Sequence, residues 1–99
     1  MIIVRRTYVP RPGQGGKLLA LVRQASQAMA DAGFKKPRVY RAWHGAHGTL
    51  YTEQEWDSIA AYESSRDAVR RTIAITSTFE QIYPLLEATH DTEVLESAD

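Results

Sequence analysis

The 99-residue sequence contains no cysteine. This absence excludes disulfide bonds, thiolate nucleophiles and cysteine-ligated metals, and with them zinc ribbons, iron–sulfur clusters and thiol enzymes. An excess of charge of one sign is also lacking, because 12 Lys and Arg balance 12 Asp and Glu. A chain without net positive charge has no electrostatic preference for nucleic acid or for an anionic membrane surface, so we expect neither as a partner.

Long hydrophobic runs are absent as well. No apolar stretch approaches the roughly 18 residues that span a bilayer. The apolar residues 1–4 are followed at once by two arginines, whereas a secretory signal has a longer apolar core. We therefore expect a cytoplasmic protein. Its length and its ordinary globular composition predict a single domain over residues 1–99.

Hydrophobic patterning in the first half of the chain predicts a strand, a helix and a hairpin. Residues 2–9 are rich in β-branched and aromatic side chains and end at a Pro- and Gly-rich segment, which is typical of a strand and a loop. Apolar residues then recur every three or four positions from Lys17 to Ala32, and Gly33 follows as a left-handed cap, which predicts a helix. The glycine-rich tip at residues 45–48 predicts a β-hairpin.

The end of the hairpin has two interpretations. The second strand ends near Tyr51 if residues 52–55 form a capping box, or it continues to Trp56. We prefer the longer strand with Asp57 or Ser58 as the N-cap of the next helix, because both side chains have short oxygen acceptors.

The last part of the chain is predicted to be helical and then extended. Residues 59–73 carry an amphipathic pattern, and Ser77 with Glu80 matches a further capping box, which predicts a short third helix. Pro84 is expected to kink or end that helix. Residues 92–96 predict a final strand.

This order of elements is the split βαβ pattern of the ferredoxin-like fold. It predicts an α+β (βαββαβ) domain with a four-stranded antiparallel sheet and the helices on one face. The other face is left uncovered, and its Ile, Val, Tyr and Trp side chains would form a larger apolar patch than a monomer usually exposes. We therefore expect this face to pack against a second copy of the chain in a homodimer.

Three segments resemble NIPSNAP-like proteins. Residues 6–8 (Arg-Thr-Tyr) with residues 12–13 (Pro-Gly) are similar to the Arg-x-Tyr strand and Pro-Gly turn of that family, and residues 40–50 and 55–63 also resemble it. The resemblance implies a homodimer that forms a dimeric α+β barrel, in which two four-stranded sheets lie face to face as in antibiotic-biosynthesis-type monooxygenases. That scaffold hosts oxygenases, isomerases, haem-degrading enzymes and proteins with no known activity.

Arg6 and Tyr8 share one face of the first strand because side chains alternate along a strand. If this face looks into the barrel, the guanidinium needs a carboxylate, either from Glu53 of the third strand or from a ligand.

The register of the hairpin decides which of its side chains share that face. In one register Tyr40 and Tyr51 line the same cavity, and a shift of one residue replaces them with Arg41 and Trp43. The predicted substrate-binding residues are Arg6, Tyr8, Tyr40 and Tyr51.

The closest histidine pair is His44 and His47. Two imidazoles can ligate a metal or haem iron, but the hairpin tip has no carboxylate and a metal site normally has three or four protein ligands, so we predict no metal and no cofactor. His44 lies at a predicted strand end, where an imidazole can act as an acid or a base. We predict His44 and Tyr8 as catalytic candidates, with capping of the hairpin as the structural alternative for His44.

Arg66, Arg70 and Arg71 form a basic patch on the second predicted helix. Glu63 and Asp67 lie one turn away, so a solvated face with exposed ion pairs explains the patch.

The sequence and the resemblance together predict a homodimer that binds a small aromatic or acidic organic molecule in the barrel cleft. A cofactor-independent monooxygenase or isomerase is one hypothesis for its activity. A non-catalytic interaction or carrier protein is the alternative, and a haem-binding protein is a third.

Overall fold

The computed structural model describes residues 1–46 and 48–99. Four strands and three α-helices follow one another, with a short 3-10 helix before the last strand: β1 (Ile2–Tyr8), α1 (Gly15–Asp31), β2 (Arg38–Arg41), β3 (Leu50–Trp56), α2 (Ile59–Arg71), α3 (Ile73–Ile82), η1 (Tyr83–Leu85) and β4 (Asp91–Glu96).

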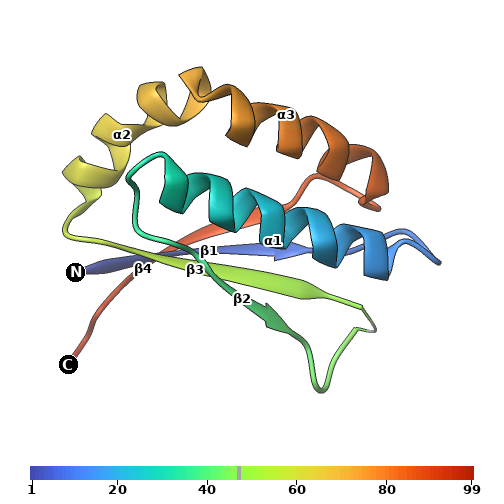
Figure 1. The fold of residues 1–99 in the computed structure, drawn as a ribbon. Helices are drawn as coiled ribbons and strands as arrows, with labels where there is room; N and C mark the ends of the chain where they lie inside the picture. The colour runs from blue at the N-terminus through green and yellow to red at the C-terminus, as the bar shows by residue number, and fades with distance from the viewer. Residues whose placement is uncertain (47) are drawn as a thin grey trace.

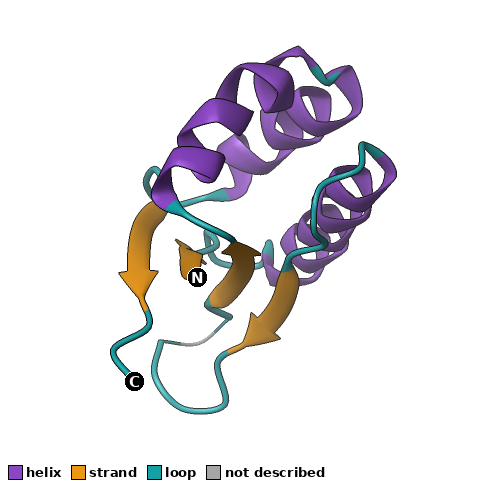
Figure 2. Cartoon of the chain, turned by 90° about the vertical axis from the view of Figure 1, so that its left-hand side faces the viewer, coloured by secondary structure: helices purple, strands orange, loops and turns teal. Residues whose placement is uncertain are grey.

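The strands form one sheet in the order β2-β3-β1-β4, with every neighbouring pair antiparallel. The helices lie together on one face of the sheet, and the opposite face is uncovered by any of them (Figures 1 and 2). This confirms the predicted ferredoxin-like α+β fold.

The core lies between the sheet and the helices, with α1 and α3 supplying most of the helical side chains. Ile2, Val4 and Tyr8 of β1 point towards the helices, and α1 presents a buried stripe to them that includes Leu18 and Val22. Each fully buried side chain of this size contributes about 1.5–3 kcal/mol. The even-numbered residues of β1 therefore face the helices, and Arg6 is one of them.

Several predicted boundaries are confirmed. β3 continues to Trp56, and Ser58 caps α2, since its Oγ accepts a hydrogen bond from the Ala61 backbone N–H at 3.1 Å. Gly33 follows α1 with a φ of 92°, a left-handed value that glycine adopts at little cost. Pro84 lies in η1 directly after α3, where the α-helix ends.

The predicted start of the third helix at Ser77 is wrong. The break falls at Thr72, whose extended ψ of 103° ends α2 and precedes α3 at Ile73. Ile75, Thr78 and Ile82 follow at helical spacing and are buried, so burial of this stripe continues the helix through Ser77.

The first hairpin strand was predicted to reach His44, but β2 ends at Arg41. In the parts of the chain that the structure describes, no helix is both long enough and apolar enough to cross a bilayer.

Candidate functional site

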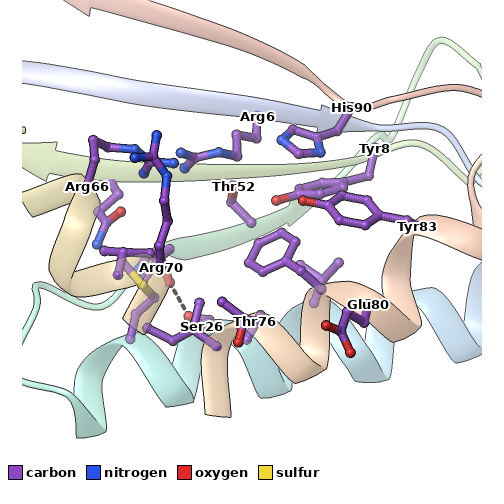
Figure 3. Close-up of a pocket in the computed structure, with 18 residues that line it drawn as sticks. Arg6, Tyr8, Ser26, Thr52, Arg66, Arg70, Thr76, Glu80, Tyr83 and His90 are labelled. Atoms are coloured by element: carbon purple, nitrogen blue, oxygen red, sulfur yellow. Dashed lines mark hydrogen bonds between the residues drawn. The ribbon is translucent and has the colours of Figure 1, made fainter. Parts of the chain in front are cut away.

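A cavity of about 310 Å³ lies between the sheet and the helices. Side chains from β1, β3 and all three helices line it, together with His90 just before β4 (Figure 3). Its polar or ionisable lining residues include Arg6, Tyr8, Ser26, Thr52, Arg66, Arg70, Thr76, Glu80, Tyr83 and His90.

One end of the cavity is basic. Arg6 of β1 donates a hydrogen bond from Nη2 to the Tyr62 hydroxyl at 3.2 Å, and the guanidinium carbon of Arg66 lies over the Tyr62 ring at 5.1 Å from its centroid. Arg70 lies one helical turn after Arg66 at the same end (Figure 3). This end therefore attracts an anionic group.

The other end is aromatic. The rings of Tyr83 and His90 are stacked, with 5.9 Å between centroids and an interplanar angle of 4°. Tyr8 lies 5.3 Å from the His90 ring, and Phe79 lies 5.9 Å from Tyr83. Four rings thus form a wall against which a planar molecule can pack.

His90 is held neutral near pH 7. Burial lowers its pKa below the ordinary 6.5, and the positive charge of Arg6 lowers it further. Its buried Nδ1 has no hydrogen-bond partner among the described residues. A neutral imidazole on a cavity wall can accept a hydrogen bond or a proton from a bound molecule.

Tyr8 is a hydrogen-bond donor in this environment. Burial raises the pKa of its phenol above 10.0, while the Arg6 charge and the Thr52 hydroxyl oppose this shift. The hydroxyl stays protonated at neutral pH, so the cavity pairs a donor, Tyr8, with an acceptor, His90.

The structure places the predicted pair Arg6 and Tyr8 together on this cavity, as strand alternation required. The expectation that their face of the sheet looks into the barrel is wrong, because this face is covered by the helices, against which Tyr8 is buried. Glu53, the predicted internal partner of Arg6, lies on the opposite face of the sheet. It pairs there with Arg5, whose Nη2 lies 2.8 Å from its carboxylate, because Arg5 and not Arg6 is opposite Glu53 in the register.

Tyr40 and Tyr51 do not share the cavity of Arg6 and Tyr8, which corrects that expectation. Tyr51 is opposite Thr7 in the β1–β3 register, and Tyr40 is opposite Tyr51, so both lie on the uncovered face. The two tyrosines line a shallow depression on that face with Arg5 and Glu53.

The other register alternative also leaves its residues outside the cavity. Arg41 is opposite Leu50 and shares the helical side, but it is exposed at the sheet edge. Trp43 lies beyond the end of β2 and is 92% exposed.

His44 lies in the exposed loop after β2, away from the cavity. Its predicted position at a strand end was wrong because β2 stops three residues earlier. His47 lies outside the described residues. Among the described residues, no group of three or more His, Cys, Asp and Glu side chains is placed to hold a metal ion.

Sequence reasoning missed His90 and Tyr83, and it assigned Arg66 to a solvated face although Arg66 is half-buried on the cavity. For Arg70 the predicted exposed ion pair is confirmed, because Arg70 is exposed and its guanidinium lies 3.4 Å from the Asp67 carboxylate, although Arg70 also lines the cavity. Arg66 carried a signal, because it interrupts the apolar stripe of the second helix, and a charged residue at such a position points towards the core or a cavity. His90 carried none, because it lies in an irregular segment that the fold alone brings beside Tyr8.

These features define the class of protein: a ferredoxin-like α+β chain with a basic and aromatic cavity between its sheet and its helices. No protein-family model matches the sequence, and no curated protein sequence matches it.

Solved structures share the fold over almost the whole chain. An uncharacterised NIPSNAP domain protein from Burkholderia xenovorans matches with a TM-score of 0.84 and 16% identity, covering 99% of this chain and 95% of its own. A NIPSNAP family protein from Agrobacterium tumefaciens matches with a TM-score of 0.84 and 17% identity, covering 99% and 93%. An antibiotic biosynthesis monooxygenase matches with a TM-score of 0.78 and 14% identity, covering 100% of both chains. The chain therefore has the fold of the NIPSNAP and antibiotic biosynthesis monooxygenase proteins.

Proposed function

We propose that the cavity between the sheet and the helices binds a small aromatic or acidic organic molecule. The observation that carries this proposal is the wall of four rings, Tyr8, Phe79, Tyr83 and His90, on a cavity large enough for one small ligand. The arginines at the other end add affinity for an acidic group.

Blocking the cavity tests this proposal. Thr76 lines the cavity from α3, so Thr76→Phe fills part of it, whereas Gln81→Phe adds the same ring on an exposed part of the same helix. We expect naphthalene carboxylate to raise the melting temperature of the wild-type protein and of Gln81→Phe but not of Thr76→Phe. Equal shifts in all three proteins would place the binding site elsewhere.

A proton-transfer reaction in the cavity is the second proposal, in the class of a cofactor-independent monooxygenase or isomerase. It is favoured by the neutral imidazole of His90, which lines the cavity beside the protonated Tyr8. His90 takes a proton from an acidic O–H or C–H of the ligand, and Tyr8 donates to the oxygen on which charge develops. Returning the proton to another carbon gives an isomerisation. In an oxygenase reaction the ligand gives up two hydrogens to O₂, one oxygen atom enters the ligand and the other leaves as water.

Two histidine variants separate this reaction from a carrier role. Oxygen uptake and spectral change are followed with a panel of quinols, and we expect any turnover to be lost in His90→Gln and kept in His44→Gln. Binding without turnover in the wild-type protein would favour the non-catalytic carrier. Loss of turnover in His44→Gln instead would favour His44, the residue predicted from the sequence, as the catalytic residue. The same panel includes haem, and a Soret band that disappears in His44→Gln would favour the haem-binding hypothesis.

We also propose that the uncovered face of the sheet packs against a second copy of the chain. This face carries Ile3, Tyr40, Tyr51 and Leu95 beside the Arg5–Glu53 ion pair, so it offers apolar area and charges of both signs to an identical face. Light scattering tests the proposal: a dimer is expected at micromolar concentration and a monomer for Tyr51→Glu. A monomeric wild-type protein would refute the proposed dimer.

The cytoplasmic location stays a prediction, which cell fractionation tests.

A further inference from the structure

The basic end of the cavity brings two guanidinium groups to one phenol. Arg6 reaches Tyr62 from the sheet and donates to its hydroxyl, and Arg66 covers the ring of Tyr62 from its own helix, α2. Both arginines are half-buried and line the cavity. Two like charges in such a place repel each other more strongly than in water.

No acidic side chain of the described residues compensates these two charges. The ion pairs of the described chain are Arg5 with Glu53, Lys35 with Glu55, and Arg70 with Asp67, so neither Arg6 nor Arg66 has a carboxylate within 4.0 Å. Glu80 also lines the cavity, but it lies at the aromatic end beneath Tyr83 (Figure 3). An anion between the arginines would remove the repulsion and supply the missing acceptors.

The shape of the cavity restricts which anion fits. A guanidinium presents a planar fork that matches the two oxygens of a carboxylate. At the opposite end, the parallel rings of Tyr83 and His90 favour a flat, conjugated group over a branched aliphatic one. A ligand that satisfies both ends carries its acid at one end and an aromatic ring at the other.

We infer that the ligand is an aromatic carboxylic acid, bound with its carboxylate at Arg6 and Arg66 and its ring against Tyr83 and His90. This inference rests on the proposed binding function and specifies its substrate class. Arg66 is the residue that selects acids over their neutral analogues. Because α2 supplies this arginine and the ring wall comes from the end of β1, α3, η1 and the segment before β4, the cavity also fixes the direction in which the molecule lies.

Isothermal titration calorimetry with a matched pair of probes tests the inference. Naphthalene carboxylate and naphthalene carboxamide have nearly the same size and shape and differ in charge. We expect the wild-type protein to bind the carboxylate about tenfold more tightly or better, as the loss of charge-assisted hydrogen bonds predicts. Arg66→Gln should reduce this preference to about twofold or less, and Arg66→Lys, which keeps the charge without the fork, should restore part of it.

Arg71→Gln is the matched control, because Arg71 is exposed on the same helix and does not line the cavity. It should leave the preference unchanged, and an equal loss in Arg66→Gln and Arg71→Gln would overturn the role of Arg66. Equal affinity of the wild-type protein for both probes, abolished for both by Thr76→Phe, would overturn the acid specificity and leave the proposed binding function standing. Failure of both probes to bind at millimolar concentration would overturn both.

Discussion

Tyr62 positions both arginines at the basic end of the cavity, so removing its hydroxyl and then its ring tests how that end is held together. Tyr62→Phe deletes the acceptor that Arg6 Nη2 contacts at 3.2 Å and leaves the ring under Arg66 in place. Tyr62→Leu removes the ring as well. It thereby also ends the edge contact with Trp56, whose ring lies 5.6 Å away.

The expected losses of stability follow from these contacts. A hydrogen bond to a charged group contributes 1.5–3 kcal/mol, and because both partners are half-buried we expect about 1 kcal/mol for Tyr62→Phe. The cation–π contact and the edge contact contribute about 0.5–1 kcal/mol each. Tyr62→Leu should therefore cost about 2–3 kcal/mol in all. For a domain of this length, the first change should lower the melting temperature by roughly 5 °C.

Urea unfolding followed by circular dichroism measures both values, and Arg71→Gln, at an exposed position of the same helix, is the control, with a change of less than about 0.5 kcal/mol expected. In calorimetry, Tyr62→Phe should also weaken binding of naphthalene carboxylate, because Arg6 loses the contact that holds its guanidinium. If Tyr62→Phe is as stable as the wild type and Tyr62→Leu is no less stable than Tyr62→Phe, neither contact stabilises the fold and the described geometry of the basic end is refuted.

Three further predictions concern pH and local structure. The pKa of His90 is lower than 6.5 in the folded protein, so the unfolded chain binds this proton at a higher pH than the folded protein does. The free energy of unfolding should therefore fall as the pH drops below 6.5. In a series of urea-unfolding measurements at different pH values, His90→Gln should reduce this dependence. Ser58→Ala removes the hydroxyl that caps α2 and should cost about 1 kcal/mol in the same assay, whereas unchanged stability would mean that the cap contributes nothing. Gly33→Ala forces an alanine to a φ of 92° and should destabilise the fold by about 1 kcal/mol. Gly16→Ala, in the open first turn of α1, should stabilise the fold by about 0.5 kcal/mol. Thermal melts in which both variants shift the melting temperature in the same direction would contradict this reasoning.

Strands β1 and β3 and helix α1 were predictable because each depends on local signals, whereas β2 ends three residues before its predicted end. Alternating burial along residues 2–8 and the three- and four-residue steps of α1 are set by which side chains can face one core. The break at Thr72 was not predictable, because the capping box at Ser77 is a local signal that burial of Ile75 and Thr78 overrides.

Only the part of the candidate site that depends on local signals could be predicted. Arg6 and Tyr8 are two residues apart on one strand, so alternation alone puts them on one face. The positions of Tyr40 and Tyr51 depend on the pairing between strands, which differs by one residue between the two interpretations. His90 reaches the cavity only through the packing of a segment 82 residues after Tyr8, and no periodicity connects the two.

The single extended residue between α2 and α3 separates two helices that are anchored very differently. α3 buries Ile75, Thr78 and Ile82, whereas the 13 residues of α2 bury only Val69. Backbone amides of α2 should therefore exchange with solvent by local opening long before those of α3. Since α2 carries Arg66, an anion held between the sheet and this helix would supply an anchor that its own side chains lack. Hydrogen exchange in α2 should then slow more on ligand binding than anywhere else in the protein.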